Sequence, residues 1–285
     1  MRKINFSKLN GQGNDFILID STNELINLSK EKIIEMCGRH FGIGADGLIL
    51  VKNSDTYNLK MDYYNKDGSV SEMCGNGIRC MAKFAYDRKL IESENIEIET
   101  LAGVKNIFLD VKNGRVGDIM VNMGVPDFQA VNIPVKIEGI EEVFNYKIKI
   151  NSKYFHINCV SVGNPHCVIF LDKNDDLNDF PVQKWGPIIE NYKIFTNKVN
   201  VEFVKIKNSK SLDMRVWERG VGETLACGTG SCAATVAAIK LKKITSKNVT
   251  VNLKGGNLNI IWKPEELNVY LKGKVGYTFD GVYFL

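Results

Sequence analysis

The stretch MDYYNKDGSVSEMCGNG, residues 61–77, recurs in altered form as MRVWERGVGETLACGTG, residues 214–230. The two stretches align without a gap at a spacing of 153 residues, which pairs Cys74 with Cys227. A second match, at a spacing of 150 residues, pairs Gly13-Asn14 with Gly163-Asn164. Such internal similarity is typical of a duplicated half-molecule, the alternative being a chance likeness of glycine-rich turns. We therefore expect two related halves that each contribute one cysteine.

Around these stretches, short runs of β-branched and aromatic residues predict strands. The runs cover residues 16–19, 48–51, 96–100, 116–121, 168–171 and 199–204. Segments with the length and spacing of helices are fewer, and they cover residues 30–39, 76–89 and 229–242. The mixture predicts an α+β fold with much sheet. A chain of 285 residues suits two domains or one large domain.

Composition excludes several functional classes. Hydrophobic residues make up 44% and charged residues 25%, as in ordinary soluble proteins. The net charge of +4 comes from scattered basic residues, which gives no case for nucleic-acid binding. No apolar run approaches the ~18 residues that cross a bilayer, and the N-terminus turns polar too early for a signal peptide. Seven cysteines without a C-x-x-C pair predict free thiols in a reducing compartment, and hence a cytoplasmic protein.

Cys74 and Cys227 each stand immediately before a predicted helix. Unpaired N–H groups at a helix N-terminus attract anions, so each sulfur should lie in a site that favours the thiolate. In such places the pKa of a thiol falls from about 8.5 to roughly 3.5–7.5. The same N–H groups suit a substrate carboxylate.

Duplicated halves often face each other about a pseudo-twofold axis, which would place the two cysteines across a cleft. One thiolate could then remove the proton from the α-carbon of an amino acid while the opposite thiol returns a proton to the other face. This chemistry inverts the centre and requires neither a metal nor pyridoxal phosphate. A single cysteine at a helix start is more often a packing residue, and it is the pairing that favours catalysis.

Other polar residues have two interpretations each. The asparagines fit ordinary turns or strand ends, except that Asn200, between two valines, could point its carboxamide into a cleft. Glu218-Arg219 suits the ammonium and carboxylate of an amino acid, or forms a plain surface ion pair. His166 is equally a packing residue or a site residue. Cys80 and Cys232 fall inside the predicted helices and are expected to pack in the core.

Five motifs follow one another along essentially the whole chain: Gly11-Gln-Gly-Asn-Asp-Phe16, Met73-Cys-Gly-Asn-Gly77 with Arg79-Cys80, Val162-Gly-Asn-Pro-His-Cys167, Glu218-Arg-Gly220 and Ala226-Cys-Gly-Thr-Gly230. As an ordered set, these motifs resemble the diaminopimelate epimerase family. The resemblance implies a cofactor-independent isomerase that interconverts LL- and meso-2,6-diaminopimelate, for lysine and peptidoglycan precursor synthesis. Its partner would be a small amino-acid substrate, with no nucleic acid and no membrane, and we expect a homodimer.

The resemblance also implies an architecture of two pseudo-symmetric domains, each a mixed β-sheet or barrel wrapped round a central helix. The expected domains are residues 1–124 plus 274–285, carrying Cys74, and residues 125–273, carrying Cys227, with the active site in the cleft between them. The two cysteines would be the acid and the base. The reacting carboxylate would be held by Gly75, Asn76, Gly228 and Thr229, and the distal end of the substrate by Asn14, Asn65, Asn164, Asn200, Glu218 and Arg219.

The chain departs from the family pattern at Gly47, where some members carry a glutamine ligand, so that contact is not expected here. Inversion chemistry alone would equally fit a proline racemase or an isomerase of unsaturated acids. A dinucleotide-binding enzyme is a rival because Gly228, Gly230 and Ala233 match the relaxed glycine fingerprint, but no acidic residue follows at the required distance. The non-enzymatic rival is a redox sensor or an amino-acid binding protein whose cysteines close a disulfide.

Overall fold

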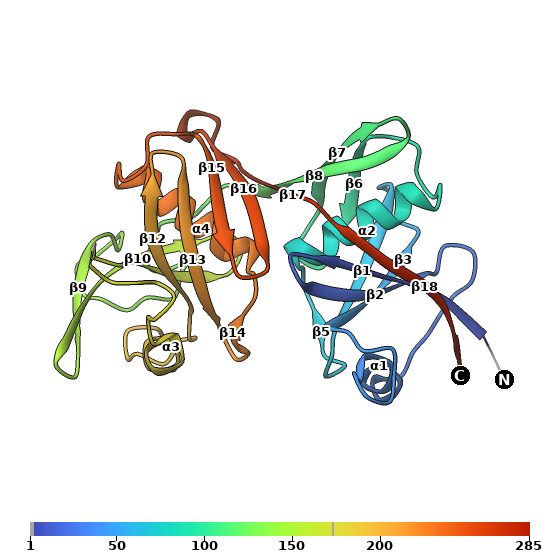
Figure 1. Ribbon diagram of the computed structural model, residues 1–285, viewed down its shortest axis with the longest axis horizontal. Coiled ribbons are helices and arrows are strands. Elements are labelled where there is room, and N and C mark those ends of the chain that lie inside the picture. Colours follow the sequence, from blue (N-terminus) through green and yellow to red (C-terminus); the bar gives the residue numbers. More distant parts are fainter. Residues whose placement is uncertain (1–2, 173) are drawn as a thin grey trace. The chain divides into compact units, whose positions relative to one another are not determined.

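The computed structural model describes residues 3–172 and 174–285, which form two compact units. Unit 1 comprises Met1–Asn122 with Lys272–Leu285, and unit 2 comprises Met123–Leu271 (Figure 1). Strands dominate both units and only four α-helices occur among the described residues, so the predicted α+β class is confirmed. None of the helices in the described part of the chain has the length and apolarity needed to span a membrane.

The strands of unit 1 enclose one helix. Its elements are β1 (Lys3–Gly11), β2 (Asn14–Asp20), α1 (Lys30–Cys37), β3 (Gly47–Lys52), β4 (Leu59–Asn65), β5 (Val70–Ser71), α2 (Gly75–Asp87), β6 (Asn95–Glu99), β7 (Lys105–Lys112), β8 (Arg115–Gly124) and the C-terminal β18 (Gly276–Phe284). β2 and β3 are parallel neighbours joined through α1, whereas β3 pairs antiparallel with β4 and β4 with β5. The C-terminal β18 returns to pair antiparallel with β1.

Unit 2 repeats this plan. Its elements are β9 (Tyr146–Ile150), β10 (Lys153–Ser161), β11 (Pro165–Phe170), α3 (Val182–Glu190), β12 (Asn200–Asn208), β13 (Ser211–Glu218), β14 (Gly222–Thr224), α4 (Gly228–Lys240), β15 (Asn248–Leu253), β16 (Gly256–Trp262), a 3-10 turn (Pro264–Glu266) and β17 (Val269–Gly273). β11 and β12 are parallel and joined through α3, β12 pairs antiparallel with β13, and β13 with β14. The order of pairings therefore matches that of β2 to β5, which is what a duplicated half-molecule requires.

Each unit is built round a helix that is buried on nearly every side. Ten of the 13 residues of α2 and 11 of the 13 residues of α4 are buried. A helix that is apolar all round belongs in a core and not on a surface. The teal α2 packs against β1, β2, β3 and β7, and the orange α4 against β10, β11, β12, β15 and β16 (Figure 1). Packing of their buried residues against these strands holds the first turns of both helices in place.

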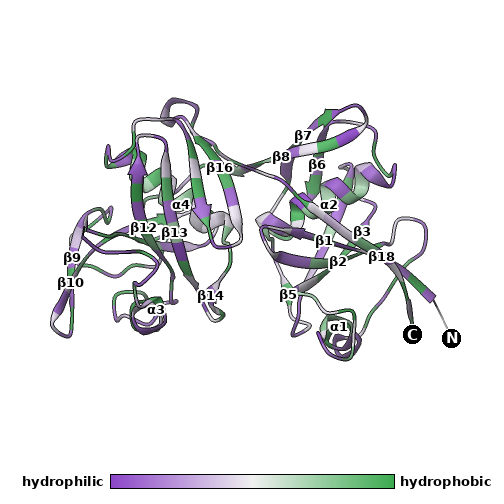
Figure 2. Ribbon diagram, viewed as in Figure 1, coloured by the Kyte–Doolittle hydropathy of each residue, from purple (hydrophilic) through white to green (hydrophobic). Residues whose placement is uncertain are grey.

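The surrounding strands show the alternation expected of sheets with one face on a core. In β16 the residues Leu258, Ile260 and Trp262 are buried, whereas Asn259 and Ile261 between them are only partly covered. Figure 2 shows this strand with purple and green bands in turn. The alternation directs one face of each strand toward the central helix.

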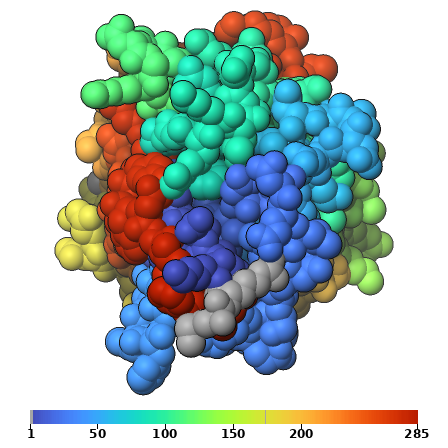
Figure 3. Space-filling model, turned by 90° about the vertical axis from the view of Figure 1, so that its right-hand side faces the viewer, coloured from blue at the N-terminus to red at the C-terminus, as the bar shows by residue number. Residues whose placement is uncertain are grey.

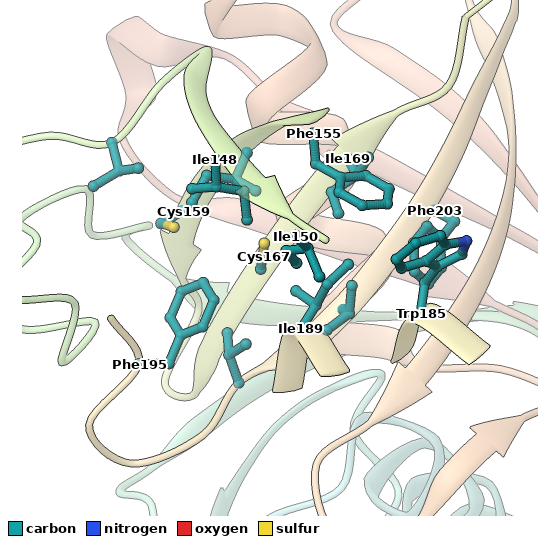
Figure 4. Packing of buried hydrophobic residues seen from close by; sticks show 14 of the residues in the cluster. Ile148, Ile150, Phe155, Cys159, Cys167, Ile169, Trp185, Ile189, Phe195 and Phe203 are labelled. Atoms are coloured by element: carbon teal, nitrogen blue, oxygen red, sulfur yellow. The ribbon is translucent and has the colours of Figure 1, made fainter. Parts of the chain in front are cut away.

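A second layer of packing in unit 2 lies between α3 and the neighbouring strands (Figure 4). The ring of Phe155 on β10 meets Trp185 on α3 at 5.0 Å between centroids, and Phe180 meets Phe203 on β12 at 4.8 Å. Cys159 and Cys167 lie opposite each other on β10 and β11 and are fully buried. This cluster fixes the strands that carry the polar residues of unit 2.

The helix α3 is absent from the sequence-based prediction. It spans only nine residues and contains Pro187, which cannot donate a backbone hydrogen bond and therefore opposes a helical prediction. Its stability comes from the tertiary contacts of its buried Trp185 and Ile189. The three predicted helices exist with shifted ends, and α1 stops at Cys37 because Gly38 adopts an extended conformation.

Candidate active site

Cys74 and Cys227 occupy the same structural position in the two units. Each is the N-cap of its central helix, with φ and ψ of −136° and 121° for Cys74 and −126° and 117° for Cys227. The Cys74 sulfur accepts a hydrogen bond from the N–H of Gly77 at 3.5 Å, and the Cys227 sulfur accepts one from Gly230 at 3.3 Å. The predicted placement at helix N-termini is confirmed. A sulfur here takes the place of the usual oxygen of an N-cap side chain.

The Cys74 sulfur lies beside a chain of carboxamides. It donates to Oδ1 of Asn14 at 3.7 Å, and Nδ2 of Asn76 donates to the same oxygen at 3.2 Å. Nδ2 of Asn14 donates in turn to Oδ2 of Asp46 at 3.0 Å. The structure thus brings together three of the predicted site residues of unit 1, Asn14, Cys74 and Asn76, by direct contact.

Arg79 anchors the other end of this chain. Its side chain is completely buried, and its guanidinium donates to the carbonyl of Gly75 at 2.9 Å, to Oδ1 of Asn76 at 3.0 Å and to Oε1 of Gln12. A buried charge is costly unless its hydrogen bonds are made. The sequence alone indicated no role for Arg79, Asp46 or Gln12, although an arginine directly before Cys80, a cysteine expected in the core, is a signal that could have been used.

Cys227 is more deeply buried than Cys74, with 6% of its surface exposed. Burial raises the pKa of its thiol well above the usual 9.0, and the carboxylates of Glu218 and Glu202 add to the rise. The hydrogen bonds of Thr229 and Gly230 lower the pKa, but by less. The prediction of a lowered pKa at the helix start is therefore wrong for Cys227, because desolvation outweighs the helix N-terminus.

A buried polar chain lies under the first turn of α4. Nδ1 of His166 is 2.7 Å from Oε1 of Glu202, and Nε2 is 2.8 Å from Oδ1 of Asn164. His166 and Glu202 are both fully buried. A Cβ atom added to Gly230 would lie only 2.7 Å from Oε1 of Glu202, so glycine is needed for this close approach. The sequence left the role of His166 open and did not single out Glu202.

Asn200 is held by backbone groups. Its Nδ2 donates to the carbonyl of Pro165 at 3.0 Å, and its Oδ1 accepts from the N–H of Arg219 at 2.9 Å. The side chain is 5% exposed. Both polar atoms of the carboxamide are therefore engaged by backbone groups. Asn200 positions the backbone of Arg219 at the end of β13.

The remaining predicted residues lie at turns close to these two helix starts in sequence. Asn65 donates to Oγ of Ser69 at 3.0 Å in the turn between β4 and β5. Glu218, at the end of β13, accepts from the hydroxyl of Thr224. Arg219 donates to the carbonyl of Asn197 at 3.0 Å. These bonds hold the turns in place around each helix start.

Gly47 has no room for a longer side chain. A Cβ atom there would lie 2.6 Å from the ring of Tyr63. The ring fills the space that a glutamine at this position would enter. Among the residues that the structure describes, no three histidine, cysteine, aspartate or glutamate side chains are grouped to hold a metal ion.

Comparisons with known proteins agree over nearly the whole chain. The family model described as diaminopimelate epimerase matches residues 6–129 and 158–278. A diaminopimelate epimerase of Leptospira biflexa is 48% identical over 98% of this chain and 98% of its own length. Another, of Pelotomaculum thermopropionicum, is 44% identical over 98% of this chain and 99% of its own length.

Solved structures with much lower identity share the fold. A hydroxyproline epimerase of Agrobacterium vitis matches with a TM-score of 0.71 at 10% identity, over 99% of this chain and 91% of that one. A Bacillus anthracis protein of the PhzF phenazine biosynthesis family matches with a TM-score of 0.69 at 16% identity, over the full length of both chains.

Proposed function

This chain belongs to the diaminopimelate epimerase family, and on that premise we propose that it interconverts LL- and meso-2,6-diaminopimelate. The observation that carries the proposal is the matched pair of N-cap cysteines, each on a rigid central helix and each within a family motif. The reaction would serve lysine and peptidoglycan precursor synthesis in the cytoplasm. Its substrate is a small amino acid, and the proposal includes no nucleic-acid or membrane partner.

In the proposed reaction, Cys74 and Cys227 act on opposite faces of one α-carbon. The thiolate of one removes the α-proton and becomes a thiol, and the electron pair moves into the carboxylate as an enediolate. The thiol of the other then gives its proton to the opposite face and becomes a thiolate. The proton count is unchanged, and the next turnover starts with the roles exchanged.

The first turns of the two helices supply the electrostatic support. Gly75 and Asn76 begin α2, and Gly228 and Thr229 begin α4, so their N–H groups lie among the unpaired donors of each helix start. We assign these four residues to the reacting carboxylate, whose charge increases when the α-proton leaves. Six residues are assigned to the distal end of the substrate: Asn14, Asn65, Asn164, Asn200, Glu218 and Arg219.

Ionisation of Cys227 depends on what enters the site. The buried setting of this thiol and its two carboxylate neighbours favour the protonated form when no ligand is bound. An incoming ammonium group would offset the charge of Glu218, which otherwise holds the pKa of Cys227 high. We propose that substrate binding promotes formation of the thiolate.

For the oligomeric state we propose a homodimer formed through β18. Four of its apolar side chains are 37–54% exposed, namely Tyr277, Phe279, Val282 and Phe284. Figure 3 shows this red strand on the surface beside the blue N-terminal segment. A second copy covering these side chains would remove apolar surface from water. Sedimentation of the wild type and of F279K tests the proposal, since a monomeric wild type would contradict it.

The activity is tested by incubating the reduced protein with LL-diaminopimelate in D2O. We expect deuterium at the α-carbon and formation of the meso isomer. Cys74→Ala and Cys227→Ala should each abolish epimerisation, whereas Cys232→Ala, inside the same helix as Cys227, should keep it. Exchange into L-proline or trans-4-hydroxy-L-proline but not diaminopimelate would assign a different substrate, and binding without exchange would favour the amino-acid binding protein.

A further inference from the structure

The hydrogen-bond chain beside Cys74 has a direction that its two ends impose. Arg79 is a guanidinium, which can only donate, and Asp46 is a carboxylate, which can only accept. Between them stand the carboxamides of Asn76 and Asn14, each of which can present either its oxygen or its nitrogen. Such orientations are ordinarily ambiguous and have to be inferred from their partners.

Starting at Arg79, every bond in the chain is determined. The guanidinium donates to Oδ1 of Asn76 at 3.0 Å, which leaves Nδ2 of Asn76 to donate to Asn14 at 3.2 Å. Asn14 must therefore present Oδ1 to Asn76. Starting at Asp46 gives the same answer, because its Oδ2 accepts from Nδ2 of Asn14 at 3.0 Å. Both ends turn the oxygen of Asn14 toward α2.

This same oxygen lies 3.7 Å from the sulfur of Cys74. A thiol can donate its hydrogen to Oδ1, whereas a thiolate would face the lone pairs of that oxygen. The N–H of Gly77 supplies a donor to the sulfur at 3.5 Å, and a thiol can accept this bond while donating the other. A protonated sulfur at Cys74 therefore has both an acceptor for its hydrogen, Oδ1 of Asn14, and a donor, the N–H of Gly77.

We propose that Arg79 and Asp46 are positioning residues for Cys74: together they orient the carboxamides of Asn76 and Asn14 so that the proton stays on Cys74 when no substrate is bound. The inference deepens the proposed function, because it rests on Cys74 being one of the two reacting thiols. It assigns to a buried arginine and a partly exposed aspartate a task that neither performs by touching the sulfur.

The residues at the matching positions of unit 2 do not repeat the hydrogen-bond chain that runs from Arg79 to Asp46. The residue that corresponds to Asn76 is Thr229, and the one that corresponds to Arg79 is Cys232. The hydroxyl of Thr229 lies 3.5 Å from the sulfur of Cys227 and can either donate to it or accept from it. The orientation imposed on Asn14 therefore distinguishes two sulfurs whose backbone settings are alike.

The charged groups near the chain come from several elements. Arg39, after α1, donates to Oδ1 of Asp46 at 2.8 Å and to Asp15 on β2 at 2.9 Å. Lys8 on β1 pairs with Asp15 at 2.9 Å. A substitution at Asp46 or Arg79 alone would change the local charge as well as the hydrogen bonds. A test needs a variant in which the charge is balanced.

The double variant D46N/R79Q meets this need, because it removes one negative and one positive charge and leaves both ends of the chain able to donate or accept. Either single variant keeps one directional end, so it should leave Asn14 oriented. In the double variant, Nδ2 of Asn14 can turn to the sulfur and favour the thiolate. D46N/R79K is the matched control, because a lysine also can only donate.

The readout is the pH–rate profile for alkylation of Cys74 by iodoacetamide, measured residue by residue by mass spectrometry in the ligand-free protein. We expect the midpoint for Cys74 to fall by about one pH unit in D46N/R79Q, with about tenfold more thiolate at neutral pH. D46N, R79Q and D46N/R79K should remain within about threefold of the wild type. The profile of Cys227 should not move.

Two results would overturn the inference. One is a double variant whose Cys74 profile equals that of the wild type, and the other is a double variant whose shift is the sum of the two single shifts. If D46N/R79Q fails to fold by circular dichroism, D46N/N76A takes its place with D46N as its matched control, because these two variants carry the same charge and only D46N/N76A disconnects Asn14 from Arg79. The assay needs no turnover, so its outcome is separate from the D2O test of the proposed function.

Discussion

Oε1 of Glu202 lies 2.7 Å from Nδ1 of His166, and neither side chain has any surface exposed to solvent. The other oxygen, Oε2, has no hydrogen-bond partner among the residues that the structure describes. This pair lies under the first turn of α4, against Gly230. The contact joins β12, which carries Glu202, to the parallel strand β11, which carries His166. In the register of these two strands Glu202 is opposite Val168. The pair therefore couples the position of the strands to that of the helix start that carries Cys227.

Removing Glu202 should destabilise the protein strongly. Glu202→Ala leaves Nδ1 of His166 buried without its hydrogen-bond partner, which costs about 1–3 kcal/mol. Glu202→Gln keeps a hydrogen bond to the ring and should cost less. Urea unfolding measures both, with the exposed Glu97→Ala as the control, expected within about 0.5 kcal/mol of wild type. Equal stability of Glu202→Ala and Glu97→Ala would contradict this account.

A methyl group at Gly230 should disturb the site of unit 2, whereas the matching change in unit 1 should not. In Gly230→Ala the new Cβ would lie 2.7 Å from Oε1 of Glu202 and 3.3 Å from the sulfur of Cys227. Overpacking of this kind costs about 1–3 kcal/mol, and a displaced sulfur should lower kcat about tenfold.

Gly77→Ala is the control for this change. Its Cβ would meet the flexible tips of Ile49 and Met61 at 3.1 and 3.3 Å, which can shift at little cost. We expect a change in stability below about 1 kcal/mol. Thermal melts and epimerase rates of the two variants give the comparison, and similar losses in both would show that the steric argument does not separate the two units.

The reaction should accelerate with rising pH. Catalysis needs one thiolate, and the pKa of Cys227 in the ligand-free protein is raised well above 9.0 by burial, Glu218 and Glu202. The thiolate fraction of the free enzyme therefore grows as the pH increases from 7 toward 9. Because kcat/KM reports the free enzyme, its pH profile should climb over this range, whereas a profile that falls from pH 7 upward would contradict the assignment.

Acid should weaken unit 1 through Asp15. Burial raises the pKa of this carboxyl, but hydrogen bonds from Arg39 and Lys8 outweigh burial and bring it down to about 2, from the usual 3.8. A lowered pKa in the folded state contributes stability that is present above about pH 4 and is lost as the pH falls toward 2.

Asp15→Asn should remove that dependence. Since Arg39 is 56% exposed and therefore screened, we expect about 1 kcal/mol of pH-dependent stability between pH 5 and pH 2 in the wild type and less in the variant. Urea midpoints across this pH range provide the measurement. Parallel curves for the two proteins would mean that the ion pairs of Asp15 contribute nothing to folding.

Much of the fold could be predicted because it depends on local patterns of residue order and hydrophobicity. The gapless match of residues 61–77 with 214–230 predicted related halves, and the pairings of β2 to β5 and of β11 to β14 follow one plan. The apolar stretches after Cys74 and Cys227 predicted the helices that both units bury. The helix α3 was missed, because Pro187 opposes a helix locally and packing of Trp185 and Ile189 stabilises it.

By itself, the sequence determined the duplication, the two cysteines at helix starts and membership of a family, since each depends on the order and spacing of residues. Tertiary structure decided the rest. It raised the pKa of Cys227, engaged Asn200 with backbone groups, and set Arg79 and Asp46 at opposite ends of one hydrogen-bond chain. Burial and hydrogen-bond direction depend on groups that lie far apart along the chain, and spacing along a sequence does not record which of them meet.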